Sequence, residues 1–124
     1  MRRKRGTDLT RNEHTLLAAA LRLRYLGTGQ LYGYELFATL RAWEGAEPMN
    51  HGTLYRGLRA LEGRGLFTSA EDDGAGEGER YRVFYELTAD GLAAARRSTV
   101  QLAALEHPPS WIDIGLAAPA PEDR

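Results

Sequence analysis

The side chains best suited to bind a ligand are two arginines, Arg56 and Arg59, in a stretch with helical periodicity. Leu54, Leu58 and Leu61 recur there at the spacing of a buried helix face. At about 100° per residue, the two arginines lie on the opposite side of the helix. Guanidinium groups recognise phosphates and guanine edges, so a helix with this pattern can lie in the major groove of DNA. An ordinary amphipathic helix with a solvated arginine face has the same pattern.

The residues that flank these arginines favour close contact with a partner. Asn50 is a good N-cap and leaves backbone N–H groups free at the start of the helix. Gly52 lies on the arginine face, where the lack of a side chain lets a partner approach closely. Gly63 and Gly65 end the helix, which is therefore expected over 51–64.

Two helices are expected before this one. Thr10 and Glu13 have the spacing of a capping box, and the apolar residues between Leu16 and Leu26 give the first helix a wide apolar face. A very short strand at 30–32 leads into the second helix at Gly33. The predicted buried stripe of the second helix consists of Leu36, Phe37, Leu40 and Trp43. A helix, a short turn and a helix with a basic outward face form a helix-turn-helix.

A β-hairpin is expected next. Residues 66–69 are expected to form one strand, and residues 80–87 alternate between two faces as a second strand does. The loop at 71–79 is rich in glycine and acidic residues. A hairpin directly after a helix-turn-helix is a wing, whose tip can lie along the phosphate backbone. Because DNA contact favours cations, Arg80 and Arg82 at the base of the hairpin are the expected wing contacts.

A last helix is expected from Thr88 to about Leu105. Its narrow apolar stripe is close to a 3.5-residue repeat, so it packs either on the first helix or on a second subunit. The stripe consists of Leu92, Ala95, Thr99 and Leu102. Beyond this helix, Trp111 and Ile114 are expected to dock on the body of the molecule. The composition of the last few residues predicts disorder.

Charge is unevenly distributed, although the net charge is only −1. Residues 1–70 contain 11 Lys and Arg and 6 Asp and Glu, whereas residues 71–124 contain 5 and 11. This asymmetry indicates that the first half faces a polyanion. The flexible arm at 1–9 either contacts phosphates or keeps the protein in solution. Its charged residues include Arg2, Arg3, Lys4 and Arg5.

The composition argues against several other classes of protein. Without cysteine there is no disulfide framework and no thiolate site, and no apolar run is long enough to span a bilayer. The N-terminus lacks the apolar region of a secretory signal, so a cytoplasmic protein is expected. His14, His51 and His107 lie on separate predicted elements and form no metal-binding motif. We therefore expect no enzyme activity, no metal and no cofactor.

Three blocks of sequence stand in a distinctive order. Residues 29–36 read GQLYGYEL, residues 52–66 read GTLYRGLRALEGRGL, and residues 82–91 read RVFYELTADG. Together they resemble the PadR family of bacterial transcription regulators, whose motifs are G-x-L-H-G-Y-E-L, G-T-L-Y-x-x-L-x-x-L-E-x-x-G-L and R-x-Y-Y-x-L-T-x-x-G. The resemblance covers roughly residues 12–105.

The resemblance implies a mainly α fold with a small β-hairpin. A winged helix-turn-helix at 10–87 would bind DNA, a C-terminal helix at 88–106 would dimerise, and a partly disordered tail would follow at 107–124. The implied function is that of a homodimer that binds a palindromic operator and usually represses transcription. The positions that would contact DNA are Tyr34, Asn50, His51, Gly52, Thr53, Tyr55, Arg56, Arg59, Arg80 and Arg82.

The short C-terminal helix is typical of the compact subgroup of the family, which has a single such helix. In that subgroup the two C-terminal helices of a dimer often enclose a flat apolar pore. A small aromatic or hydrophobic effector is therefore a candidate partner. The residues that would form the dimer contact and line the pore are Leu92, Ala95, Thr99 and Leu102.

The sequence departs from the family at Tyr32, where the family has histidine, and at Phe84, which replaces the first of two tyrosines. The acidic wing and the near-neutral net charge motivate an alternative function. In this alternative the winged helix is a protein-interaction module with weak or lost DNA binding. A continuous positive stripe through Arg56, Arg59 and Arg80 would favour DNA, and a broken one would favour the alternative.

Overall fold

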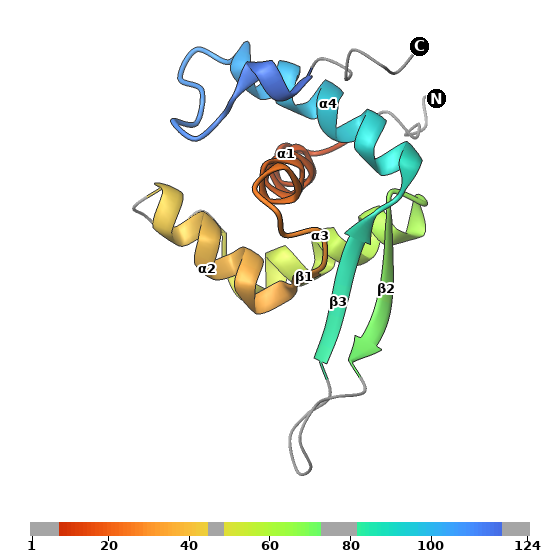
Figure 1. Cartoon of the computed structure of the whole chain (residues 1–124). Coiled ribbons are helices and arrows are strands. Elements are labelled where there is room, and N and C mark those ends of the chain that lie inside the picture. The colour runs from red at the N-terminus through yellow and green to blue at the C-terminus, as the bar shows by residue number, and fades with distance from the viewer. Residues whose placement is uncertain (1–7, 45–48, 73–81, 118–124) are drawn as a thin grey trace, which may run out of the picture.

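The computed structural model describes residues 8–44, 49–72 and 82–117 (Figure 1). Within these ranges the chain forms four α-helices, three short strands and one 3-10 turn, which is the mainly α fold with a hairpin that the sequence predicts. In chain order the elements are α1 (Arg11–Tyr25), β1 (Leu31–Tyr32), α2 (Gly33–Glu44), α3 (His51–Gly63), β2 (Phe67–Asp72), β3 (Arg82–Leu87), α4 (Ala89–Ala103) and η1 (Ile114–Ala117). None of these helices is long and apolar enough to cross a membrane.

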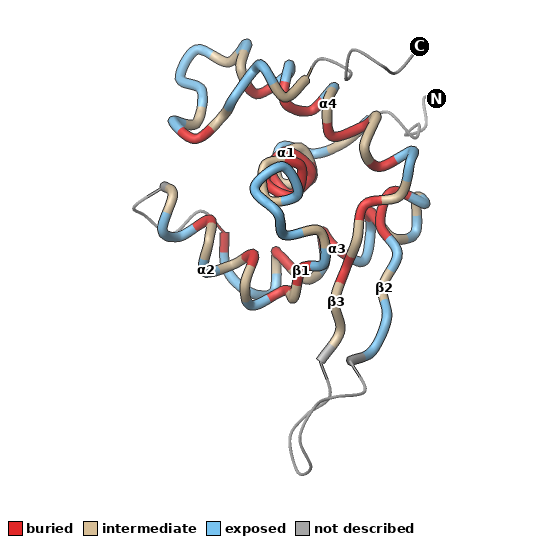
Figure 2. Tube along the Cα trace, in the orientation of Figure 1, coloured by how far each residue is buried: buried red, intermediate tan, exposed pale blue. Residues whose placement is uncertain are grey.

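Helix α1 lies at the centre of the molecule, with α4 and η1 on one side and α2 and α3 on the other (Figure 1). Leu16 and Leu17 of α1 are fully buried, and the buried segments of the surrounding helices face them (Figure 2). Gly57 lets α3 pack closely on α1, because a Cβ at this position would lie 2.6 Å from Leu16 Cδ1. The core around α1 therefore holds α3 in a fixed orientation.

Side-chain caps start three of the helices. Thr10 and Glu13 form a reciprocal capping box at α1, since Glu13 N–H donates to Thr10 Oγ1 at 3.1 Å and Thr10 N–H donates to Glu13 Oε1 at 2.9 Å. Asn50 caps α3 and Thr88 caps α4, each by accepting a backbone N–H of the first turn at 2.8 Å. The three caps confirm the helix starts that the sequence predicts.

Strand β3 is the centre of an antiparallel sheet with the strand order β1-β3-β2. The register pairs Leu31 with Tyr85, Phe67 with Leu87, and Asp72 with Arg82. Strand β2 is longer than the predicted 66–69, because the acidic residues after Ser69 still pair with β3 through their backbones. Since β1 runs directly into α2, the sheet is joined to the start of the helix-turn-helix.

Three apolar residues that were expected to be buried are exposed. Tyr25 and Leu26 are 72% and 60% exposed, because α1 ends at Tyr25 and the chain turns at Gly27 with a positive φ of 107°. Ile114, which was expected to dock on the body, is 54% exposed. Trp111 is only 7% exposed, as predicted.

The apolar stripe of α4 faces the interior of the protomer. Ala95, Thr99 and Leu102 are almost fully buried, and α4 packs on α1. The hydroxyl of Thr99 donates to the carbonyl oxygen of Ala95 at 2.9 Å, so its polar group is also satisfied there. Leu92 is half-buried. Of the two packing modes considered for this stripe, the structure has the contact with the first helix.

Candidate nucleic-acid interface

Helix α3 exposes both of its arginines on one face. Leu54, Leu58 and Leu61 are fully buried against the core, whereas Arg56 and Arg59 are exposed. The orientation expected from the spacing of the leucines is therefore confirmed. Because the leucine face of α3 packs on the core, the arginine face of the helix is a rigid surface.

The guanidinium of Arg56 lies over the first turn of α3. Its Nη2 donates to Thr53 Oγ1 at 3.3 Å, and a Cβ at Gly52 would lie 3.4 Å from its Nη1. A side chain at residue 52 would thus crowd Arg56 and project from the exposed surface of the helix. Asn50 accepts the Thr53 N–H, so one backbone donor at the helix start is satisfied. Further N–H groups of the first turn remain without intrahelical partners and can bind an anion.

Arg59 lies at the junction of α3 and the hairpin. Burial raises the pKa of Tyr85 in β3, nearby Glu62 raises it further, and Arg59 acts in the opposite direction. Arg59 is therefore close enough to β3 to influence the phenol. The hydroxyl of Ser69 donates to Glu62 Oε2 at 2.7 Å, which ties α3 to β2. Arg59 therefore lies beside the strands of the hairpin.

Tyr55 joins α3 to the first turn of α2. A Cβ at Gly33 would lie 2.6 Å from the Tyr55 hydroxyl oxygen, so the glycine makes room for the ring. Burial raises the pKa of Tyr55, and nearby Tyr34 raises it further. The Tyr55 phenol stays protonated at neutral pH and remains a hydrogen-bond donor. It lies beside the N-terminus of a helix, where the helix dipole and backbone N–H groups favour a phosphate.

Aromatic rings connect the start of α2 to the sheet. The rings of Tyr32 and Tyr34 are stacked with their centroids 5.5 Å apart, and Phe84 meets Tyr32 edge-on at 6.0 Å. Tyr32 N–H also donates to Glu35 Oε1 at 3.3 Å. Both residues that depart from the family motif, Tyr32 and Phe84, are thus in contact with each other. Tyr34, which is exposed at the start of α2, therefore stacks on a ring that packs against β3.

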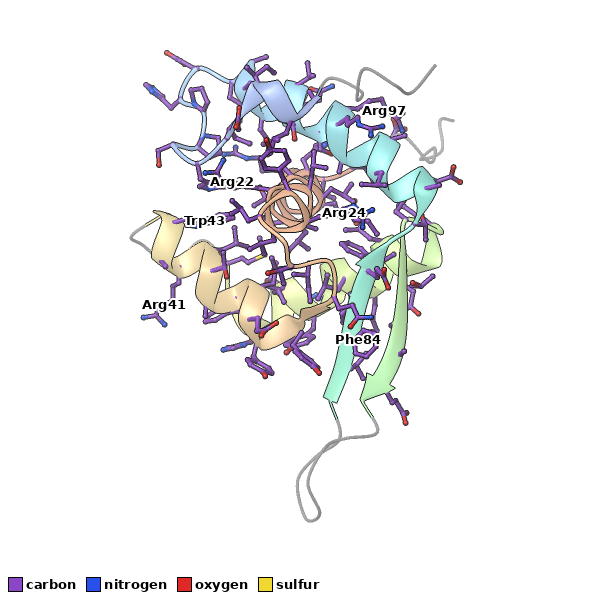
Figure 3. All side chains as sticks on the ribbon, in the orientation of Figure 1. Arg22, Arg24, Arg41, Trp43, Phe84 and Arg97 are labelled. Atoms are coloured by element: carbon purple, nitrogen blue, oxygen red, sulfur yellow. The ribbon has the colours of Figure 1, made fainter. Side chains whose placement is uncertain are left out.

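A second group of rings joins α2 to α3 and brings in an arginine that sequence reasoning missed. The rings of Phe37 and His51 are stacked at 3.8 Å, and His51 is stacked with Tyr55 at 6.5 Å. The guanidinium carbon of Arg41 lies 6.0 Å from the centre of the Phe37 ring. Arg41 is exposed and points away from the body of the molecule (Figure 3). The i, i+4 spacing of Phe37 and Arg41 was the available signal for this residue.

The structure brings the predicted positions of α2 and α3 together on one side of the molecule. These positions are Tyr34, Asn50, His51, Gly52, Thr53, Tyr55, Arg56 and Arg59. Arg82 is the first residue of β3, and Arg80 lies outside the described residues, as do the arm residues Arg2, Arg3, Lys4 and Arg5. Across the ranges that are described, no three His, Asp or Glu side chains gather as a metal site.

The chain is similar to known proteins in both sequence and structure. The model of the "Transcriptional regulator PadR-like family" matches residues 23–97. Curated proteins give no match. Among solved structures, a PadR family transcriptional regulator from Eggerthella lenta is 31% identical, with 73% of each chain covered and a TM-score of 0.56.

Two further solved structures share the fold at lower identity. Bacillus subtilis PadR in complex with operator DNA is 22% identical, with a TM-score of 0.54; the match covers 80% of the present chain and 54% of the Bacillus chain. A PadR family transcription regulator from Clostridium difficile is 24% identical, with a TM-score of 0.50 and coverage of 69% and 86%. The three structures have the same arrangement of helices and strands over most of the present chain.

Proposed function

The chain belongs to the PadR-like family of transcriptional regulators, and from this premise we propose that it represses transcription by binding a specific operator through α3. In this proposal residues 10–87 form the DNA-binding unit. The observation that carries it is the exposed face of α3, where Arg56 and Arg59 stand on a helix whose other face is fully buried. A rigid helix with two exposed guanidinium groups fits the major groove.

The groups around α3 support contacts with the phosphate backbone. The phenols of Tyr34 and Tyr55 lie at the start of α2, where a helix N-terminus favours an anion. Arg41 adds a charge on the outer side of the same helix. Arg80 and Arg82 would serve the base of the wing, and the residues of the arm would add affinity that does not depend on sequence. The Bacillus neighbour, which shares the fold, was solved with operator DNA, and this supports DNA as the partner here.

A homodimer would bind two half-sites of a palindromic operator that are about 34 Å apart, one turn of the double helix. Within one protomer, Ala95, Thr99 and Leu102 are occupied by the contact with α1. The dimer contact is therefore proposed on the outer face of α4, where Val100 is exposed, together with the half-buried Leu92. An effector pore between two copies of α4 would be lined by this outer face.

Selection of binding sites from genomic DNA with the purified full chain, at several salt concentrations, tests the proposal. We expect a short inverted repeat whose affinity falls steeply with salt, because binding to phosphates releases counterions. The absence of an enriched site, with only weak salt-sensitive binding, would contradict operator recognition. That result would favour the winged helix as a protein-interaction module. Reporter expression with and without the protein then distinguishes repression from activation.

A further inference from the structure

The chain after α4 turns back across the core and reaches the helix-turn-helix. Residues 110–117, called the tail segment below, pack on α1 and α4 (Figure 1). Trp111 is buried, and its ring lies 5.3 Å from the ring of Trp43, with 31° between the ring planes. Trp43 belongs to the last turn of α2. The tail segment therefore contacts the end of α2 that is remote from Tyr34.

An arginine of α1 completes the contact. The guanidinium carbon of Arg22 lies 5.6 Å from the centre of the Trp43 ring, and its Nη1 is 3.9 Å from Asp113 Oδ2. Figure 3 shows Arg22 and Trp43 next to each other between α1 and α2. Three elements thus meet at one place, namely the central helix, the first helix of the helix-turn-helix and the tail segment.

The geometry of α2 gives this contact a consequence for the candidate interface. A helix of this length moves as one body, so a restraint at Trp43 also restrains Tyr34 and Gly33 at the opposite end. Gly33 lies against Tyr55 of α3, and Arg41 is exposed on the same helix. The tilt of α2 therefore decides where the Tyr34 phenol and Arg41 lie relative to the arginine face of α3.

We propose that Trp111 is a positioning residue for DNA binding, through its ring contact with Trp43 of α2. This inference rests on the proposed function. The ring contact carries the effect, because Trp111 is buried, Trp43 is half-buried, and aromatic pairs of this geometry attract each other. The ion pair contributes little, since the side chains of Arg22 and Asp113 are 32% and 50% exposed. The tail segment therefore sets the position of α2, although the two are far apart in the sequence.

Hydrogen exchange of the full chain tests the contact without DNA. In Trp111→Leu, which keeps an apolar side chain in the core but removes the indole, α2 amides are expected to exchange about tenfold faster. The amides of β3 should keep their protection, because this strand lies on the other side of α1 from the tail segment. Ile114→Ala is the matched control, since Ile114 belongs to the same segment and is exposed. Unchanged exchange in α2 would overturn the proposal, and so would an equal increase in every element.

Operator binding tests the consequence. Trp111→Leu should weaken binding about tenfold and reduce its salt dependence, because a tilted α2 loses phosphate contacts. Titration of DNA at high protein concentration gives the fraction of protein that is active. If Trp111→Leu only unfolds part of the protein, the active molecules will bind with the affinity and the salt dependence of wild type. Such an outcome would overturn the positioning role. Trp111→Phe, which retains a ring, should recover most of the affinity.

A double-mutant cycle separates the ring contact from other effects. Trp43→Leu should weaken binding as Trp111→Leu does, and the two changes together should cost less than the product of the single effects. Independent effects of the two changes would contradict the contact. If Trp111→Leu does not fold, Trp43→Leu tests the same contact from the side of α2. If the wild-type chain binds no DNA, the proposed function fails, and hydrogen exchange still decides whether Trp111 holds α2.

Discussion

The ring of Tyr55 fills the space that a side chain at residue 33 would occupy, with the hydroxyl oxygen 2.6 Å from the position of a Cβ on Gly33. This relationship links helix α3 to the first turn of α2 and fixes the distance between the two helices. It also explains why the phenol of Tyr55 is partly withdrawn from water, which raises its pKa.

Gly33→Ala should separate the start of α2 from α3. The added methyl group would collide with the Tyr55 ring, and overpacking of this kind costs about 1–3 kcal/mol of unfolding free energy. Urea denaturation measures the loss. Gly63→Ala is the control, because Gly63 is the last residue of α3 and a Cβ there would meet no neighbouring atom within 4 Å. Equal stability of Gly33→Ala and wild type would show that Tyr55 can move aside.

Arg56→Ala and Arg59→Ala should each weaken operator binding by about 1–3 kcal/mol, with no change in melting temperature. Both side chains are exposed, so folding does not depend on them. Fluorescence anisotropy with a labelled operator measures the affinity. Arg24→Ala removes the same charge from an exposed position on α1, outside the candidate interface and the proposed dimer contact, and should bind normally. Unchanged affinity in both α3 variants would rule out a major-groove role for this helix.

Arg41→Ala should reduce the salt dependence of binding rather than its sequence specificity. A guanidinium that contacts a phosphate contributes about one unit to the slope of log affinity against log salt. The variant is therefore expected to lose affinity by a similar factor for operator and for unrelated DNA. A loss confined to the operator would instead place Arg41 on a base edge. A slope identical to that of wild type would remove Arg41 from the interface.

Stability should decrease as the pH falls below about 6.5, partly because of His14. Its Nδ1 lies 2.8 Å from Ser98 Oγ, and burial lowers its pKa below the ordinary value of 6.5, with Glu13 acting in the opposite direction. The folded state therefore binds the proton less readily than the unfolded state. The stabilisation is complete above 6.5 and is lost as the pH falls through the folded-state pKa. Urea denaturation across this range should show a smaller loss for His14→Asn, and an equal loss would contradict the assignment.

Local patterns predict the start and the buried face of most helices. Thr10, Asn50 and Thr88 cap their helices as their residue types suggest, because an N-cap depends only on atoms of the next turn. The leucine spacing predicts the arginine face of α3 for the same reason. The site on α2 and α3 could therefore be outlined from the sequence, apart from Arg41.

Contacts between distant parts of the chain could not be predicted in the same way. Tyr25 and Leu26 are of residue types that are often buried. They are exposed because they lie beyond the part of α1 that the neighbouring elements cover. The sequence suggested that Trp111 docks on the body. It could not identify Trp43 as the contact partner, because this contact depends on where the tail segment crosses α1. The acidic residues of β2 pair with β3 through backbone groups, which side-chain patterns do not reveal.

The strand order β1-β3-β2 leaves β2 at the rim of the sheet. A strand in this place presents backbone N–H and C=O groups to which a strand of another molecule can add. The exposed carboxylate of Glu71 lies on β2, and charged side chains at such a rim hinder strand addition between identical chains. We therefore expect Glu71 to protect this strand against aggregation, whether or not the hairpin approaches DNA.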